Sequence, residues 1–368
     1  MALIWKANVE TEVLNHLQEA LRTIPLLDIG TIRQNVRLNN ERTIYEADAV
    51  IDITVNGESH MLLIETKKSL YPRDAREAVW QVRKLQKLLQ ESESRKIVPL
   101  IASGSISEGA REFLQSERIS YFDEGGSIFL ADEGLYVLRE KLPSKKANRT
   151  ERSLFTGRRT QVLLGLFQEP ESWHQVHDLS NKTFASTATV SQVFVELQRR
   201  EWVTVRGTGP RKERRLERPS ELLDAWAKNV ADSPKPKPRR FYAPSLKGEE
   251  LMMKINQACE SHGIAYAITG EWAAQIYSPF LSSIPQVRLR FPDDKSLSMM
   301  TSELKAREVN EGSNLAVIGS SSYGDFLFRE QLRGVWLANP ILVYLDLLQG
   351  DGRAKEMAEH LRRERIHF

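Results

Sequence analysis

The chain has 368 residues, of which 41% are hydrophobic and 27% charged, a composition typical of soluble globular proteins with two or three domains. Its apolar runs are far shorter than the roughly 18 residues of a membrane span, and the first residues lack the pattern of a signal peptide, so a cytoplasmic protein without membrane association is expected. The single cysteine, Cys259, excludes an internal disulfide and a multi-cysteine metal site.

The net charge of +3 is unevenly distributed along the chain. Residues 141–240 hold 21 Lys and Arg against 11 Asp and Glu, which leaves the remainder of the chain with a net charge of −7. A polyanion such as DNA would therefore be attracted to the middle of the chain. Segments rich in Pro, Lys and Ser near residues 142–152 and 231–245 are typical of linkers. They predict three domains, at residues 1–143, 150–230 and 243–368.

The first segment contains helical and strand-like patterns in turn. An amphipathic helix is predicted over residues 9–22, and strands over 47–55 and 60–66 would form a hairpin through the Asn56-Gly57 turn. The further predicted elements are a helix at 75–89, a strand at 96–102, a helix at 107–115, and strands at 119–123 and 127–131. This order predicts a mixed sheet with helices on its faces, and hence an α/β multidomain protein.

Carboxylates and a lysine lie on the two strands of the predicted hairpin. Strand alternation places Asp48 and Asp52 on one face of the first strand, and Glu65 and Lys67 on one face of the second. The two aspartates are about 13 Å apart along the strand, so only one can approach Glu65. Asp48 is preferred because it stands at the start of the strand, before the apolar run. Two carboxylates can hold Mg²⁺ or Mn²⁺, and a lysine beside them can orient or help deprotonate water. The pattern predicts a phosphodiester-cleaving site; the alternative is the polar end of an apolar strand.

Asp48 followed by Glu65-Thr66-Lys67 resembles the motif of the PD-(D/E)xK nuclease superfamily. The resemblance implies a restriction-endonuclease-like mixed α/β sheet. It also implies that Asp48 and Glu65 are metal ligands and that Lys67 is the catalytic lysine. Gln81, on the helix that follows, would be an auxiliary catalytic residue.

The first helix offers a further similarity to this superfamily, and the residue before Asp48 departs from its motif. The superfamily often carries an acidic residue on its first helix, and here Glu10 or Glu12 could take this place. Ala47 stands where the eponymous motif has proline, which is a mild departure. Many domains of this kind keep the fold and only bind, so a role as a binding or dimerisation platform stays open.

Residues 158–218 have the pattern of a winged helix-turn-helix. Helices are predicted at 158–167, 173–181 and 188–200, the third capped by Ser186 or Thr187. A strand at 202–206, a turn at 207–210 and a basic strand at 211–216 would form the wing, and Ser220 would cap a closing helix at 221–227. The arrangement resembles the winged-helix domains of bacterial transcription regulators, which implies binding of double-stranded DNA.

The third helix would contact base edges and the wing would contact phosphates. The residues predicted to contact DNA are Thr187, Thr189, Ser191, Gln192, Arg206, Arg211, Lys212, Arg214 and Arg215. The alternative is a winged helix that binds protein, for example as a dimer interface. The clustering of positive charge favours DNA, and a homodimer on palindromic half-sites is the default expectation.

Residues 246–368 have the pattern of another α/β unit, with helices at 247–262 and 270–277, strands at 265–268 and 286–291, and a helical hairpin after Asn339-Pro340. Thr269-Gly270-Glu271-Trp272-Ala273-Ala274 and Leu345-Asp346-Leu347-Leu348 resemble landmarks in the C-terminal domain of AbiEi-like type IV antitoxins. The resemblance implies a nucleotidyltransferase-like fold and a possible cognate toxin, or another protein, as partner.

Nucleotide transfer is not expected from this segment. Enzymes of that fold hold Mg²⁺ with paired aspartates on a strand that here offers Arg288 and Arg290. These arginines share a strand face that could touch phosphate, although an ordinary exposed face is the simpler expectation. Asp293-Asp294 is expected in a solvated loop, and Asp346 is expected to cap or pair within the helical hairpin.

Two functions of different classes are compatible with these patterns. The first is a metal-dependent DNA endonuclease that the winged helix delivers to its target. The second is a non-cleaving transcriptional regulator or type IV antitoxin-like repressor. The set of Asp48, Glu65 and Lys67 favours the nuclease, whereas the antitoxin-like remainder of the chain favours the regulator.

Overall fold

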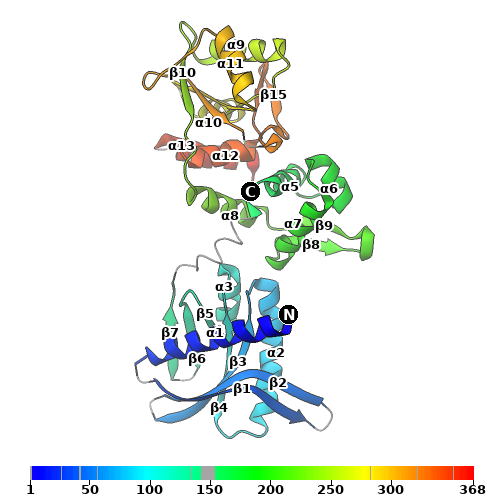
Figure 1. Ribbon diagram of the computed structural model, residues 1–368, viewed down its shortest axis with the longest axis vertical. Helices are drawn as coiled ribbons and strands as arrows, with labels where there is room; N and C mark the ends of the chain where they lie inside the picture. Colours follow the sequence, from blue (N-terminus) through cyan, green and yellow to red (C-terminus); the bar gives the residue numbers. More distant parts are fainter. Residues whose placement is uncertain are drawn as a thin grey trace. The chain divides into compact units, whose positions relative to one another are not determined.

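The structure is a computed structural model (Figure 1). It describes residues 2–25, 27–40, 43–55, 57–132, 134–141, 154–281, 283–320, 322–350 and 352–368. The chain forms two compact units: the first comprises Met1–Glu151, and the second runs from Arg152 to Phe368, apart from the four residues Gln198–Glu201, which group with the first. Helices and several sheets occur together, which confirms the predicted α/β class at this coarse level.

A seven-stranded sheet forms the centre of the first unit, in the order β1-β2-β3-β4-β5-β6-β7. β3, β4 and β5 are parallel, and the other neighbours pair antiparallel. The strands span Leu27–Asn40, Thr43–Val55, Glu58–Lys67, Lys96–Ser103, Ser120–Asp123, Ile128–Asp132 and Leu135–Arg139. β1 and β7 were not predicted. Both are edge strands with many exposed side chains, so their sequences lack a long apolar pattern.

Helices cover both faces of this sheet (Figure 1). α1 (Ala2–Arg22) packs on one face, where its leucines join the core that contains Leu62 and Ile64 of β3. α2 (Pro72–Gln90) and α3 (Glu108–Ser116) cover the other face, with Met61 and Leu63 of β3. β3 is therefore buried on both faces, which explains its continuous apolar run. Of the turn predicted between β2 and β3, Asn56 lies outside the described residues.

The second unit begins with three helices, a hairpin and a fourth helix. The elements are α5 (Arg158–Gln168), α6 (Val176–Thr183), α7 (Thr187–Arg199), β8 (Val203–Arg206), β9 (Glu213–Leu216) and α8 (Pro219–Ala231). The order agrees with the predicted winged helix. Ser186 caps α7, because its Oγ accepts from the backbone N–H of Thr189 at 3.1 Å. The predicted cap at Ser220 is wrong: α8 begins at Pro219, a residue that suits the first helical turn.

A second seven-stranded sheet follows, in the order β13-β10-β14-β12-β11-β16-β15. Its strands are β10 (Arg239–Tyr242), β11 (Ala267–Thr269), β12 (Val287–Phe291), β13 (Arg307–Glu308), β14 (Leu315–Gly319), β15 (Glu330–Leu332) and β16 (Val335–Leu337). The segment predicted as a linker at residues 231–245 thus contributes strand β10, which lies inside the sheet between β13 and β14.

The helices of this part are α9 (Gly248–Ser261), α10 (Gly270–Tyr277), α11 (Asp294–Glu303), α12 (Pro340–Leu348) and α13 (Arg353–Leu361). Asp293 and Asp294 are exposed, as expected, but they do not form a mere loop. The Asp293 carboxylate accepts from the backbone N–H of Ser296 at 2.8 Å and caps α11, whose first residue is Asp294. Among the described residues, the helices lack the combined length and hydrophobicity that a bilayer span requires.

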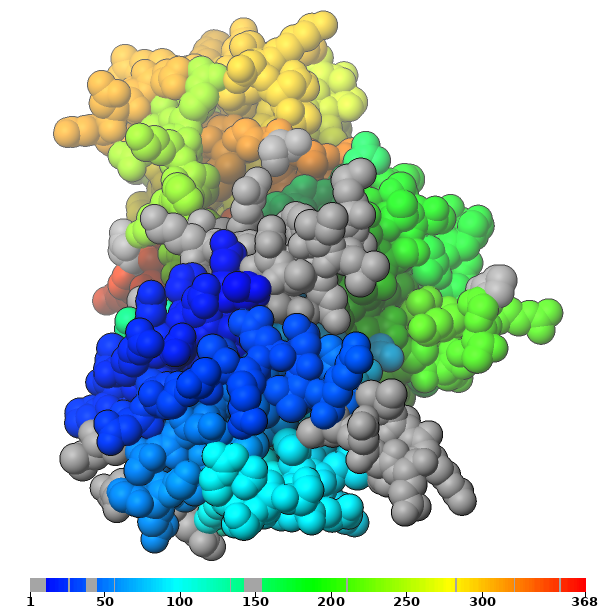
Figure 2. All heavy atoms as spheres, turned by 60° about the horizontal axis from the view of Figure 1, so that its bottom comes forward, coloured from blue at the N-terminus to red at the C-terminus, as the bar shows by residue number. Residues whose placement is uncertain are grey.

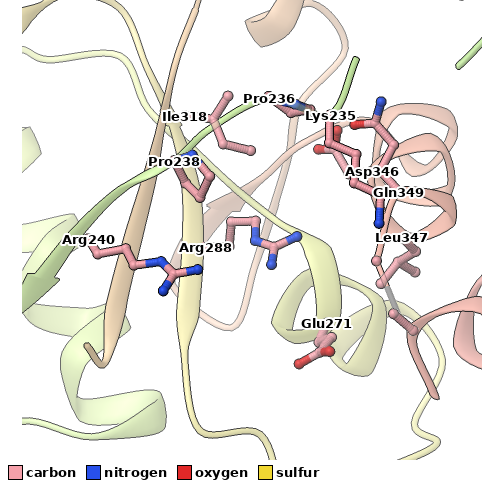
Figure 3. A pocket seen from close by; sticks show the side chains of 12 residues that line it. Lys235, Pro236, Pro238, Arg240, Glu271, Arg288, Ile318, Asp346, Leu347 and Gln349 are labelled. Carbon is pink, nitrogen blue, oxygen red and sulfur yellow. The ribbon is translucent and has the colours of Figure 1, made fainter. Parts of the chain in front are cut away.

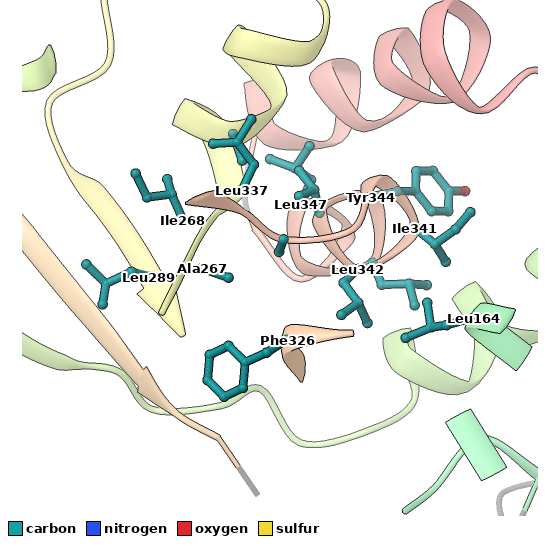
Figure 4. Close-up of a cluster of buried hydrophobic side chains, with 14 of the residues drawn as sticks. Leu164, Ala267, Ile268, Leu289, Phe326, Leu337, Ile341, Leu342, Tyr344 and Leu347 are labelled. Atoms are coloured by element: carbon teal, nitrogen blue, oxygen red, sulfur yellow. The ribbon is translucent and has the colours of Figure 1, made fainter. Parts of the chain in front are cut away.

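One hydrophobic core runs through helices α5 to α8 and the C-terminal sheet domain. Figure 4 shows Leu164 of α5 beside Leu342 of α12. Two further contacts join the same parts. The rings of Phe167 and Phe368 stack at 5.4 Å between centroids, and Arg362 Nη1 lies 2.6 Å from a carboxylate oxygen of Asp224. These two predicted domains therefore pack together as one unit.

Candidate functional site

The first half of α7 presents polar side chains on the side away from the core. Its apolar stripe is buried and consists of Val190, Val193, Phe194 and Leu197. Thr187, Ser191 and Gln192 are exposed, and Thr189 is half-buried with its hydroxyl 2.9 Å from that of Ser186. All four residues predicted on this helix thus lie near its N-terminal half, the part that approaches base edges in helix-turn-helix proteins.

Two residues beside this surface were not predicted. Arg159, at the start of α5, donates from Nη2 to Gln192 Oε1 at 3.0 Å, so a cation lies next to the polar face of α7. Phe184, in the turn before α7, has φ +53° and an exposed ring that meets the exposed ring of Tyr323 edge to face at 5.8 Å. The sequence offers no signal for the exposure of Phe184, because phenylalanine is usually buried.

The β8–β9 hairpin is the predicted wing, and it projects from the helices that precede it (Figure 1, Figure 2). Its antiparallel register places Arg206 and Arg215 on one face, and their guanidinium groups lie 4.3 and 5.3 Å from the ring centroid of Trp173. This stacking holds two cations side by side. Arg211 is exposed between the two strands, and Lys212 is half-buried.

Arg214 differs from the other predicted wing residues, because it faces the helices. Its guanidinium lies 4.9 Å from the centroid of the Phe194 ring, and its Nη1 donates to the carbonyl of Lys212 at 3.0 Å. Burial lowers the pKa of Arg214 below its usual value. Its backbone also exchanges two hydrogen bonds with His174. Arg214 therefore attaches the wing to α7. The outward cations are the exposed Arg206 and Arg211 and the half-buried Lys212 and Arg215, of which Arg206 and Arg215 pair with Glu213 and Glu217.

In the first unit, the structure brings together the residues of the predicted cleavage site. The β2–β3 register pairs Ala49 with Ile64, so Asp48 is level with the end of β3. The Oδ2 atom of Asp48 accepts from the backbone N–H of Thr66 at 2.6 Å and from its hydroxyl at 2.8 Å. Lys67 Nζ donates to Glu65 Oε1 at 2.7 Å and to Gln81 Oε1 at 3.2 Å.

The other aspartate of β2 is engaged elsewhere. Asp52 Oδ1 lies 3.1 Å from Arg33 Nη2 and 2.9 Å from Arg95 Nη1, and its register partner on β3 is Met61. This arrangement agrees with the preference for Asp48 near Glu65.

The carboxylates of Asp48 and Glu65 are the donor type that Mg²⁺ and Mn²⁺ prefer. The Glu65 side chain is 13% exposed and that of Lys67 30%, so the cluster is partly accessible to solvent. In the part of the chain that the structure describes, no group of three or more His, Cys, Asp and Glu side chains could hold a metal ion. Mg²⁺ can be held by one or two carboxylates with water and phosphate oxygens completing its shell, so Asp48 and Glu65 are the residues that would hold it.

The first helix holds two candidates for an additional acidic residue of this site. The side chain of Glu10 lies outside the described residues, and Glu12 is exposed.

The C-terminal sheet domain contains a buried ionic cluster around Arg290. Its guanidinium donates to both carboxylate oxygens of Asp346, and Nη1 lies 3.1 Å from Asp325 Oδ1. Thr269 donates its hydroxyl to Asp346 as well. Burial opposes the charge of Arg290, but the two carboxylates outweigh it, so its pKa lies above its ordinary value. The expectations of an exposed Arg290 and of an Asp346 that pairs only within the helical hairpin are therefore wrong.

Comparison with known proteins supports the interpretation of the C-terminal domain. Residues 215–367 match a family model described as a transcriptional regulator, the AbiEi antitoxin of a type IV TA system. The match begins in β9 of the wing and covers about two fifths of the chain. No curated protein and no solved structure matches the chain. The finding favours the regulator among the two predicted functions, and it leaves the nuclease-like and winged-helix resemblances as predictions.

Proposed function

We propose that the protein is an antitoxin-type transcriptional regulator that binds double-stranded DNA through the winged helix in its second unit. The observation that carries the proposal is the family match over residues 215–367, whose description is that of a transcriptional regulator. The matched segment shares one hydrophobic core with α5, α6 and α7. A regulatory C-terminal domain and a DNA-reading module would thus respond to each other as parts of one folded unit.

The surface chemistry of the winged helix supports contact with DNA. Thr187, Ser191 and Gln192 expose hydroxyl and amide groups, which can hydrogen-bond to base edges in the major groove. The outward cations of the wing can contact phosphates on both sides of that groove. A homodimer would place two such modules on half-sites about 34–36 Å apart, and a cognate toxin is the protein partner that the family description suggests.

Selection of bound duplexes from a random pool tests this proposal. The full chain is expected to enrich one sequence motif, because the polar face of α7 discriminates bases at roughly 1–3 kcal/mol per good contact. The double variant Ser191→Ala/Gln192→Ala should bind DNA without enriching that motif. The matched control is Thr204→Ala, a half-buried threonine on the wing. Enrichment of the same motif by the double variant would contradict base reading by α7.

A second candidate function is metal-dependent cleavage of DNA by the first unit. It is favoured by the contact of Lys67 with both Glu65 and Gln81, and by the position of Asp48 beside Thr66. The sequence of elements α1, β1 to β3, α2 and β4 around a mixed sheet supports a restriction-endonuclease-like fold. Asp48 and Glu65 would hold Mg²⁺ or Mn²⁺, which when bound supplies Lewis-acid stabilisation of phosphate. Lys67 would position the attacking water, with Gln81 fixing its ammonium group.

Incubation of supercoiled plasmid with the full chain and Mg²⁺ or Mn²⁺ tests cleavage. Nicking is expected to fall by at least about 100-fold in Lys67→Ala and Glu65→Ala, a loss typical of a general-base or charge-stabilising residue. Asp52→Asn is the matched control, because Asp52 lies on the same strand and is engaged by Arg33 and Arg95. Tight DNA binding without any nicking would leave the regulator as the function of the whole chain.

A further inference from the structure

A cavity of about 210 Å³ lies in the second unit, between the sheet, the α12–α13 hairpin and the segment that enters β10 (Figure 3). Its sheet side is formed by Arg240, Arg288 and Ile318. The start of α10 contributes Glu271, and the α12–α13 hairpin contributes Asp346, Leu347, Gln349, Gly350 and Ala354. The volume is below the range of drug-sized pockets, about 300–1,000 Å³, so the cavity would enclose only part of a ligand of nucleotide size.

The two arginines of the cavity lie in one row across the sheet. Arg240 of β10 and Arg288 of β12 both pair in register with Ala316 of β14, which lies between them. Residues in register point to the same face of a sheet, so the side chains of Arg240 and Arg288 lie on one face, on the two sides of Ala316. Ile318 lies on the same face, two positions along β14, whereas Leu315 and Val317 face the hydrophobic core. Arg240, Arg288 and Ile318 therefore line the cavity from one face of the sheet.

Arg288 and Arg290 share this face but differ in their partners. Arg290 is neutralised by Asp346 and Asp325. Arg288 is half-buried and Arg240 is exposed, and the described residues provide neither of them with an ion pair or a side-chain hydrogen bond. A half-buried guanidinium without a counter-charge is costly, and a phosphate oxygen is the ligand that its planar fork fits best.

The acidic residues of the lining limit where an anion can lie. Both oxygens of Asp346 are engaged by Arg290 or Thr269. Glu271, in the first turn of α10, would repel a phosphate placed beside it and would accept a hydrogen bond from a hydroxyl or amino group. A ligand with one phosphate and a hydrogen-bond-donating remainder matches both sides of the cavity.

We propose that this cavity binds a phosphate monoester that also carries hydroxyl or amino groups, such as a nucleoside or sugar monophosphate. Arg240 and Arg288 hold the phosphate, and Glu271 accepts from the remainder of the ligand. Lys235, Pro236 and Pro238 close the cavity, and they belong to the connection between α8 of the winged helix and β10. The ligand therefore touches the segment that links the DNA-reading module to the C-terminal sheet.

Isothermal titration of the full chain with AMP, inorganic phosphate and adenosine tests the proposal. Saturable binding of AMP is expected, with weaker binding of phosphate and none of adenosine. Arg288→Gln and Arg240→Gln should each weaken AMP binding by roughly 10-fold or more, as expected for loss of a charge-assisted hydrogen bond. Arg333→Gln is the matched control, because Arg333 is an exposed arginine of the same sheet domain outside the cavity lining.

A further substitution tests whether Glu271 repels a phosphate bound in the cavity. Glu271→Gln removes the repelling charge, so it should strengthen the binding of inorganic phosphate. Because Arg240 is exposed, Arg240→Gln is expected to fold even where Arg288→Gln does not, and circular dichroism verifies this. Equal AMP binding by Arg240→Gln and wild type, or no binding of either AMP or phosphate, would overturn the proposal. Displacement of AMP by non-specific duplex DNA would do the same, because the cations would then belong to a DNA-backbone contact.

Discussion

Replacement of Asp346 by asparagine removes one of the two carboxylates around the buried guanidinium of Arg290. Asp346 is 6% exposed, and both of its oxygens accept hydrogen bonds in the native protein. The substitution keeps the volume and the hydrogen-bonding oxygen but removes the negative charge. Arg290 then retains only Asp325, at 3.1 Å.

The expected magnitude follows from the burial of the cluster. Loss of one partner of a buried ion pair costs about 3–5 kcal/mol, because the remaining charge is left uncompensated in a poorly solvated site. Asp325 compensates part of the charge of Arg290, so about 3 kcal/mol is expected. For a unit of 150–250 residues, 1 kcal/mol corresponds to roughly 2–4 °C in Tm. Asp346→Asn should therefore lower the Tm of the second unit by roughly 6–12 °C.

Thermal unfolding followed by circular dichroism measures this change. The matched control is Asp294→Asn, which removes the carboxylate of an exposed ion pair with Arg239 at 3.2 Å in the same domain. Exposed pairs contribute at most about 1 kcal/mol, so the control should lower Tm by only a few degrees. A shift in Asp346→Asn no larger than that of the control would refute the reasoning from buried charge.

Three further predictions concern the second unit. Leu164→Ala should destabilise the unit by about 2–5 kcal/mol. It should also accelerate amide hydrogen exchange in both α7 and α12, because these helices share one core. Faster exchange in α7 alone would contradict a common core. Arg211→Gln should reduce the slope of log affinity for DNA against log salt by about 0.9. Arg214→Gln should lower Tm and leave that slope unchanged, because Arg214 faces the helices. Equal slopes for both variants would contradict the inward position of Arg214. Burial raises the pKa of Cys259 to about 12, so its thiol should not react with Ellman's reagent at pH 8 until the unit unfolds. Rapid reaction in the native protein would contradict that burial.

Local patterns predicted the parts of the structure that depend on neighbouring residues. Helical periodicity and turn residues indicated the three helices and the wing, because each buries one apolar stripe. The spacing of Asp48, Glu65 and Lys67 on a hairpin predicted their proximity, since antiparallel register follows from a short turn. The same two-residue period also distinguishes Arg214 from Arg215, and it would have shown that Arg214 shares the inward face of Leu216.

Features that depend on distant segments were not accessible from the sequence. Arg290 and Asp346 are 56 positions apart, and their contact requires the arrangement of β12 and α12 in the folded sheet domain. The row of Arg240, Ala316 and Arg288 likewise depends on strand order, because β10 and β12 are separated in the chain and share only β14 as a neighbour. β1 was missed because an exposed edge strand lacks the apolar alternation that identifies buried strands.

The central claim is that the second unit binds duplex DNA through the winged helix, and the salt dependence of binding tests it most directly. Affinity of the full chain for a fixed duplex is measured from about 50 to 200 mM salt, for wild type and for a variant with Arg206, Arg211, Lys212 and Arg215 all replaced by glutamine. Each lost phosphate contact reduces the slope by about 0.9, so a reduction of about 3–4 is predicted, together with much weaker binding at low salt. Unchanged affinity and an unchanged slope in a folded variant would show that the wing does not contact DNA.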